Sequence, residues 1–161
     1  MRESLCLCSI IPLVGRVLQK IRDLGIEDRT VVVFTSDNGG LSTTPDAPTS
    51  NRPLRAGKGW LYEGGIRVPL LVKWPGLTRP GSTCTVPVTS VDFFPTLLTA
   101  AQVPLRPKQT LDGADLVPLL RGRTEKENLR AIFWHYPHYH RSGHRPSGAV
   151  RFGEFKLIEY F

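Results

Sequence analysis

The amino-acid sequence predicts an α/β fold, in which helices flank a mostly parallel sheet and a small antiparallel sheet follows toward the carboxyl end. Three observations predict it. Apolar residues at helical spacing lead into an unbroken apolar run from Val31 to Phe34, which is typical of a strand covered on both faces. A polar Asp-Asn-Gly-Gly turn then follows this strand. Beyond residue 130, three short strand-like runs are separated by Gly and Pro.

The first predicted elements form a helix-then-strand unit. The helix is indicated by apolar residues at Leu13, Val17, Leu18, Ile21 and Leu24. Gly25 is expected to end it, because glycine suits the left-handed position after a helix. The strand is expected over residues 30–35. Residues 1–12 lack a polar helical face and contain Pro12, so we treat them as a separate, atypical segment.

The middle of the chain alternates loops with short elements. The sequence predicts an exposed loop at 41–52 and then a strand at 66–74, in which Pro69 suggests an edge position or a bulge. A short strand at 86–90 and a helix capped by Asp92 that ends near residue 102 are expected next. A linker at 104–108 and a helix at 114–120 ended by Gly122 complete this region. The last strands are expected at 131–136, 148–152 and 156–160. We therefore divide the chain into residues 1–12, an α/β region at 13–123, and an antiparallel subdomain at 124–161.

Composition excludes several classes of protein. Hydrophobic residues make up 40% and charged residues 22% of the 161 positions, which indicates a folded domain rather than a disordered chain. The net charge is +7, but the basic residues are scattered and form no stripe with interleaved aromatics. We interpret this charge as a basic surface with a pocket for an anionic substrate, rather than as a nucleic-acid interface.

The cysteines and the apolar runs do not indicate a cellular compartment for the protein. Three cysteines without a Cys-x-x-Cys pair predict neither a disulfide framework nor a structural zinc site. No apolar run reaches the roughly 18 residues that a membrane span requires. Residues 5–14 resemble a short signal-peptide core, but Glu3 and the absence of a small-residue cleavage site argue against one. We assign no compartment.

Two strings carry a family resemblance. FTSDNGG ends the first strand, and LRAGKGWLYEGGIRVPLLVKWPG follows it after a Ser/Thr/Pro-rich loop. Together with the later VDFFPTLL, they resemble the sulfatase family, which hydrolyses sulfate esters on an alkaline-phosphatase-like fold. The resemblance covers residues 13 to about 160 and corresponds to the carboxyl-terminal portion of a family member. It implies a mixed sheet flanked by helices and, as substrates, sulfated carbohydrates or aryl sulfates.

The resemblance implies roles for three residues. Asp37 and Asn38 match two of the family's Ca²⁺ ligands, and their side-chain oxygens are donors that hard cations prefer. The alternative is an Asx turn in which Asp37 caps backbone N–H groups. Lys58 matches the sulfate-binding lysine, since an ammonium offers three donors to sulfate oxygens; the alternative is an ordinary surface lysine. Arg55 is a further candidate for substrate binding.

The remaining polar residues are weaker candidates. We interpret Glu63 as a structural residue that fixes its loop through backbone hydrogen bonds, with Arg67 as a possible partner. Four histidines fall in the segment WHYPHYHRSGH. His135 and His138 are assigned to substrate contact, because the corresponding segment approaches the pocket in related sulfatases. A zinc site made by these histidines is the alternative.

The sequence also departs from the family. Sulfatases use a formylglycine made from the cysteine or serine of Cys/Ser-x-Pro-x-Arg, and no cysteine or serine here stands in that context. The other acidic Ca²⁺ ligands of the family are also absent. We therefore expect a sulfatase-family chain that is inactive alone and lacks an amino-terminal partner portion. The alternatives are a non-catalytic Ca²⁺- or anion-binding module, or one half of a split sulfatase.

Overall fold

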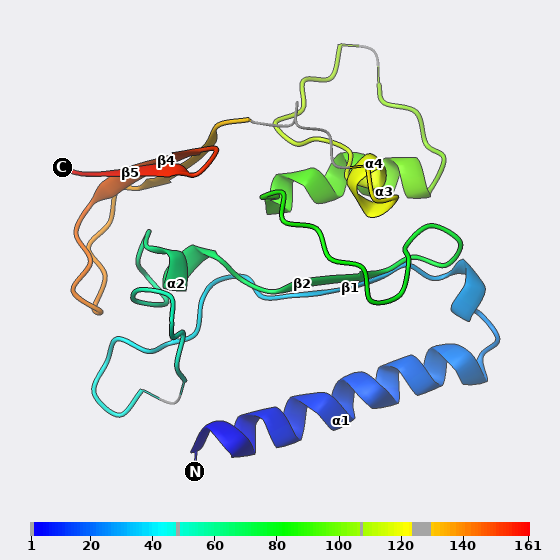
Figure 1. The fold of residues 1–161 in the computed structure, drawn as a ribbon, viewed down its shortest axis with the longest axis horizontal. Coiled ribbons are helices and arrows are strands. Elements are labelled where there is room, and N and C mark those ends of the chain that lie inside the picture. Colours follow the sequence, from blue (N-terminus) through cyan, green and yellow to red (C-terminus); the bar gives the residue numbers. More distant parts are fainter. Residues whose placement is uncertain (1, 48, 107, 124–129) are drawn as a thin grey trace. The chain divides into compact units, whose positions relative to one another are not determined.

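The computed structural model describes residues 2–47, 49–106, 108–123 and 130–161. The chain forms two compact units: Met1–Pro75 together with Phe133–Phe161, and Gly76–Ile132 (Figure 1). Parts of the expected linker 104–108 and of the expected subdomain 124–161 lie outside the described residues. The three-part division predicted from the sequence stays a prediction.

A long helix, α1, opens the first unit. It spans Arg2–Asp23 and so confirms the helix expected over residues 13–24. It also extends through Pro12, where the sequence indicated an atypical segment, although an interior proline removes one N–H donor and crowds the carbonyl four residues before it. Gly25 has a φ of 64° and donates its N–H to the carbonyl of Arg22 at 2.8 Å. This left-handed glycine ends the helix as predicted.

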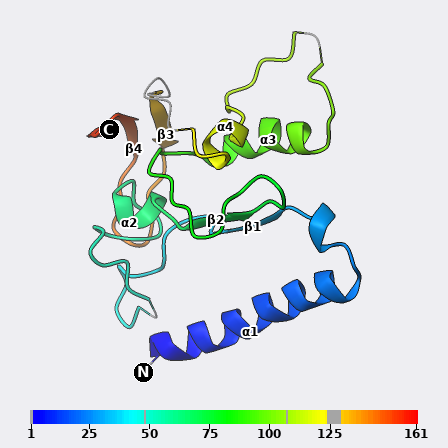
Figure 2. The same cartoon turned by 45° about the vertical axis from the view of Figure 1, so that its right-hand side comes forward.

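Strands β1 and β2 form a two-stranded antiparallel sheet. They span Val32–Thr35 and Leu70–Lys73, with Val33 opposite Val72, and Figures 1 and 2 show them side by side. The prediction that the first strand is covered on both faces is wrong for this chain, because Val33 and Phe34 are 40% and 38% exposed. Among the described residues β2 is the strand that pairs with β1, and in this two-stranded sheet three of the four residues of β1 are exposed.

A helical turn, α2, precedes β2. It spans Glu63–Ile66, whereas the sequence predicted that a strand begins at Ile66. The backbone N–H of Arg67 donates to the carbonyl of Glu63 at 2.8 Å, so this carbonyl serves the helical turn and not a strand ladder. Pro69, which has no N–H to donate, immediately precedes the shortened strand.

The second unit is helical, and a buried aspartate organises it. The short 3₁₀ helix η2, α3 and α4 span Ser90–Asp92, Phe93–Ala100 and Val117–Leu120. The Asp92 carboxylate accepts the N–H of Thr89 at 2.7 Å and the N–H of Ala114 at 2.8 Å, and it also pairs with Arg130. The strand predicted at 86–90 is wrong, because the capping box between Thr89 and Asp92 turns this backbone into a helix start.

The chain ends in a three-stranded sheet, in the order β3-β4-β5. The strands span Ile132–Tyr136, Ser147–Phe152 and Phe155–Tyr160 and confirm the three strands that the sequence predicted. Strands β4 and β5 are antiparallel and turn at Gly153, where φ is 57°. In this sheet Ser147 and Ala149 are buried on β4.

Candidate functional site

Backbone contacts between glycines bring together the segments FTSDNGG and LRAGKGWLYEGGIRVPLLVKWPG, which carry the family resemblance. The N–H of Gly39 donates to the carbonyl of Gly65 at 2.9 Å. A Cβ on Gly39 would lie 1.7 Å from the carbonyl oxygen of Gly64, and one on Gly64 would lie 2.2 Å from that of Ala56. Real side chains never approach so closely, so these glycines are required by backbone-to-backbone packing. The Asp-Asn-Gly-Gly turn therefore lies directly against the loop that carries Lys58.

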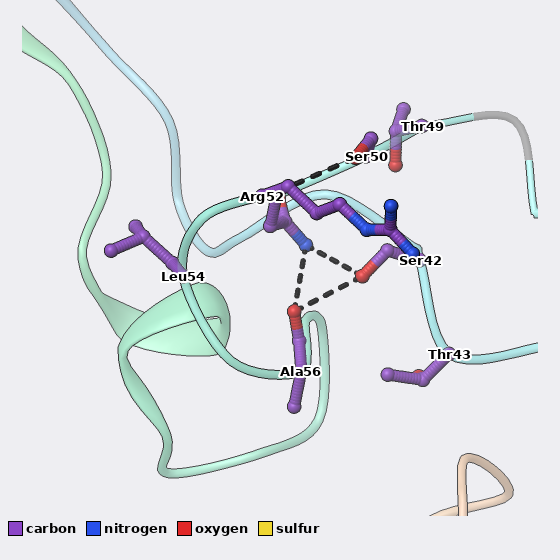
Figure 3. A pocket seen from close by; sticks show the side chains of 8 residues that line it. Ser42, Thr43, Thr49, Ser50, Arg52, Leu54 and Ala56 are labelled. Atoms are coloured by element: carbon purple, nitrogen blue, oxygen red, sulfur yellow. Dashed lines mark hydrogen bonds between the residues drawn. The ribbon is translucent and has the colours of Figure 1, made fainter.

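Asn51 ties the same two segments from the side of the intervening loop. Its amide nitrogen donates to the carbonyl of Gly40 at 2.8 Å and to that of Ala56 at 3.1 Å. Its amide oxygen accepts the N–H of Gly40 at 3.0 Å. The amide nitrogen also donates to Ser42 Oγ, which itself donates to Ala56, as the dashed lines in Figure 3 show. One side chain thus fixes the separation between the two strings.

Asp37 and Asn38 lie at the end of β1, as predicted. The Asn38 amide nitrogen donates to Asp37 Oδ2 at 2.5 Å, and Ser36 Oγ donates to the Asn38 carbonyl at 2.8 Å. Among the described residues no backbone N–H donates to the Asp37 carboxylate, so the alternative of an Asx cap is not what forms here. The other side-chain oxygen of each residue has no protein partner in the part of the chain that the structure describes.

Asp37 and Asn38 offer the type of ligand that Ca²⁺ prefers but too few ligands to hold the ion alone. Carboxylate and amide oxygens are the ligands that this ion prefers, but it takes about six to eight of them. Within the described ranges, no three His, Cys, Asp or Glu side chains converge as a metal-binding group. Within the same ranges the four histidines form no such group either, and the zinc alternative stays untested.

Lys58 sits in the tight turn between Gly57 and Gly59. Its backbone N–H donates to the carbonyl of Gly40 at 3.1 Å, which is the carbonyl that Asn51 also binds. The side chain is exposed, and its ammonium makes no hydrogen bond or ion pair with any described residue. The backbone of Lys58 is therefore fixed while its charge remains available for a ligand.

Arg55 precedes Lys58 by three residues in the same loop. Its guanidinium carbon is 3.9 Å from the ring centroid of Tyr62, a cation–π distance. The hydroxyl of Tyr160 donates to that of Tyr62 at 3.2 Å, which links the same ring to strand β5. Arg55 is exposed, and stacking limits the directions in which its guanidinium can reach an anion.

Glu63 connects the loop to the carboxyl-terminal sheet. Its carboxylate pairs with Lys156 at 3.0 Å and with Arg151 at 3.5 Å. The sequence assigned Glu63 to backbone hydrogen bonds of its own loop, with Arg67 as a possible partner, and its side-chain contacts correct this. The partners are basic side chains of β4 and β5, about 90 residues later, which no local pattern can show.

His135 and His138, which the sequence assigned to substrate contact, are both exposed. The His135 ring lies 5.9 Å from that of Phe161, and the His138 ring lies 5.5 Å from that of Tyr136. No contact joins either of them to Lys58 or to Asp37 among the described residues. Their role in substrate contact stays a prediction.

The other two histidines of the segment make the contacts with the lysine loop. Gly59 has a φ of 87°, and a Cβ on it would lie 2.2 Å from His140 Nδ1. His144 is 1% exposed, and its ring packs edge-on to Trp60 at 5.1 Å. Burial, and then the neighbouring His140, lower the pKa of His144. Sequence reasoning missed both residues, because spacing alone does not distinguish them from His135 and His138.

A polar hollow lies beside the hydrogen bonds that Asn51 makes to Gly40, Ser42 and Ala56. Its volume is about 490 Å³, and Figure 3 shows the side chains around it. The lining includes four hydroxyl side chains and one guanidinium: Ser42, Thr43, Thr49, Ser50 and Arg52. The Thr43 hydroxyl oxygen is buried without a hydrogen-bond partner. Hydroxyls and a guanidinium suit a hydroxylated, anionic ligand.

Comparison with known proteins decides the family. The family model described as Sulfatase matches residues 12–103, which is more than half of the chain. The chain belongs to the sulfatase family. Among curated sulfatases, one from Formosa agariphila is 38% identical over 151 residues, covering 86% of this chain and 27% of its own length. Human arylsulfatase A is 43% identical over 143 residues, covering 89% of this chain and 27% of its own length.

Solved sulfatase structures show the same fold. The structure of Ps i-CgsB in complex with k-i-k-neocarrahexaose superposes with a TM-score of 0.76 at 30% identity, over 91% of this chain and 31% of that one. The fold is therefore alkaline-phosphatase-like α/β, as the sequence predicted. This sulfatase chain spans about a quarter of the length of the curated relatives it matches. No helix in the described part of the chain is long and apolar enough to cross a membrane.

Proposed function

We propose that this chain supplies the carboxyl-terminal part of a sulfuric ester hydrolase site, with Lys58 as its sulfate-binding residue. The observation that carries the proposal is the glycine packing of Gly39 against Gly64, which brings the Asp37–Asn38 turn against the Lys58 loop. A fixed backbone with a free ammonium suits sulfate binding, because the loop holds the lysine beside the Asp37–Asn38 turn and no described residue competes for its charge.

Asp37 and Asn38 are the proposed Ca²⁺ ligands of this chain. Their free oxygens supply two of the ligands, and the remainder would come from the portion of the family member that this chain does not span. A bound Ca²⁺ neutralises charge on sulfate oxygens by Lewis-acid polarisation. Arg55, His135 and His138 are proposed to contact the rest of the substrate, which is a sulfated carbohydrate or an aryl sulfate.

The sugar class is supported by two observations. The hollow beside Asn51 is lined by hydroxyls and the Arg52 guanidinium, which match the hydroxyl and sulfate groups of a sulfated glycan. The Ps i-CgsB structure, similar to this chain over 91% of it, contains a neocarrahexaose.

The isolated chain is proposed not to turn over sulfate esters. The formylglycine sequence Cys/Ser-x-Pro-x-Arg is absent from its 161 residues, and covalent transfer has no first step without the nucleophile. The test is hydrolysis of 4-nitrocatechol sulfate by the purified chain, with and without Ca²⁺. No release above buffer is expected, and a rate abolished by Lys58→Ala would refute the proposed inactivity.

Sulfate binding is tested separately. Titration of the chain with sodium sulfate, at an ionic strength kept constant with NaCl, should shift the Lys58 amide and ammonium resonances. Lys58→Ala should remove binding, whereas Lys20→Ala, which removes one exposed positive charge from α1, should leave it unchanged. Equal losses in the two variants would mean that net charge attracts the anion and that Lys58 forms no site.

A further inference from the structure

The His140 ring lies on the lysine turn itself. A Cβ on Gly59 would lie 2.2 Å from Nδ1 and 2.7 Å from Cγ of His140, so the ring occupies the space that a side chain at Gly59 would need. Gly59 directly follows Lys58 in the chain. The absence of a side chain at this position thus has two effects: it permits the positive φ of 87°, and it admits the His140 imidazole against the residue that follows the lysine.

The orientation of this ring is fixed from its other side. The backbone N–H of Ser142 donates to His140 Nδ1 at 3.2 Å, and Ser142 Oγ lies 2.8 Å from the same nitrogen. A backbone N–H can only donate, so Nδ1 must be an acceptor and carries no proton. In the neutral ring the proton is therefore on Nε2, which has no protein partner among the described residues.

Two backbone hydrogen bonds close the turn that carries His140. The N–H of His140 donates to the carbonyl of His144 at 3.0 Å, and the N–H of Gly143 donates to the carbonyl of His140 at 2.9 Å. His144 is buried, and its Nε2 lies 2.8 Å from Ser147 Oγ on β4. Because His144 packs on Trp60 and His140 packs on Gly59, the turn contacts two consecutive residues after Lys58.

We propose that His140 is a second sulfate-contacting residue, which donates its Nε2–H to the anion held by Lys58. This inference rests on the proposed function, because it adds a donor to the same site. A neutral imidazole with a fixed tautomer adds direction without adding charge, whereas the ammonium adds charge without fixed direction. The exposed His135 and His138 lack any comparable anchor at the lysine turn.

The experiment separates the two nitrogens of the ring. In place of histidine, the amide nitrogen of glutamine reaches the position of Nε2 and can donate as Nε2–H does. The amide oxygen of asparagine reaches the position of Nδ1 and can accept the N–H of Ser142. Sulfate affinity of the full chain is measured by the NMR titration above for His140→Gln, His140→Asn and His140→Ala. Tyr139→Ala is the matched control, since Tyr139 is the neighbouring residue and is 80% exposed.

If Nε2–H binds sulfate, His140→Gln should stay within about twofold of wild type, while the Asn and Ala variants should bind about tenfold more weakly, as expected for one charge-assisted hydrogen bond. Tyr139→Ala should bind as wild type does. Imidazole ¹⁵N spectra of the free chain should show a bare Nδ1 and a protonated Nε2 on His140, and the Nε2–H resonance should shift with the same midpoint as Lys58.

Three results would overturn the inference. Restoration by Asn but not by Gln would show that the ring acts through Ser142 as a structural element. A proton on Nδ1 in the free chain would contradict the tautomer. Unchanged affinity in all three His140 variants, with loss in Lys58→Ala, would remove His140 from the site while the proposed function stands. A wild-type chain that binds no sulfate would instead remove both proposals.

Discussion

Asn51→Ala should loosen the turn that holds Lys58 without touching Lys58 itself. The substitution deletes four hydrogen bonds, to the N–H and carbonyl of Gly40, to Ser42 Oγ and to the carbonyl of Ala56. The Gly40 carbonyl keeps the N–H of Lys58 and the Ala56 carbonyl keeps Ser42. The Gly40 N–H keeps no partner among the described residues.

The expected cost follows from this inventory. Each net hydrogen bond is worth about 0.5–1.5 kcal/mol, and three of the four affected groups keep another partner. Asn51 is also only half-buried, so water can replace part of the loss. We therefore expect local opening to become easier by about 2 kcal/mol, which corresponds to about thirtyfold faster exchange of the Lys58 amide proton.

Native-state hydrogen exchange followed by NMR measures this effect. Amides of the β4–β5 ladder serve as an internal reference, and Ser50→Ala is the control, because its hydroxyl is exposed and makes one long contact of 3.4 Å to the N–H of Arg52. Asn51→Asp should be at least as harmful, since it replaces a donor by an oxygen that faces the carbonyls of Gly40 and Ala56. If the Lys58 amide proton exchanges at the same rate in Asn51→Ala as in the wild type, the Asn51 side chain does not hold the two segments together.

Two further perturbations test the packing around the site. Gly39→Ala places a Cβ 1.7 Å from the Gly64 carbonyl oxygen and should lower the thermal midpoint, whereas Gly15→Ala on α1, with nothing within 4 Å, should add about 0.5–1 kcal/mol; equal effects would contradict the backbone contact. Burial lowers the pKa of His144 in the folded chain. Below the ordinary histidine pKa of about 6.5, the unfolded chain therefore binds more protons than the folded chain does. The stability that neutral His144 contributes is present in full above that pH and decreases as the pH falls toward the folded pKa. Urea midpoints between pH 8 and 5 should show a decrease that His144→Asn reduces, and identical pH profiles would argue against a neutral His144.

Local patterns predicted the elements that local forces build. The helix over residues 13–24 and the last three strands follow from side-chain period and from glycine turns, and the structure has them. The strand expected at 86–90 failed because the Thr89–Asp92 capping box competes with strand pairing. The burial expected for Val31–Phe34 failed because burial depends on the neighbouring strands, which periodicity does not specify.

The candidate site was predictable in its residues but not in its contacts. Asp37, Asn38 and Lys58 could be named from the two strings, yet their proximity depends on main-chain contacts between glycines that no side-chain pattern records. The histidine segment shows the same limit. A tight turn closed by the bond from the His140 N–H to the His144 carbonyl decides which rings face the lysine loop, and the sequence favoured His135 and His138 instead.

The ion pairs of Glu63 also set the order in which the site can be completed during synthesis. Lys156 follows Glu63 by 93 residues, and a ribosome adds about 5–20 residues each second. The lysine loop therefore waits about 5 to 20 s before its basic partners on β4 and β5 exist. During that interval the Glu63 carboxylate has neither of its basic partners and is solvated by water. A pause in translation after residue 65 would lengthen this interval, and a chain that ended before β5 would lack Lys156 and leave Glu63 with Arg151 as its basic partner.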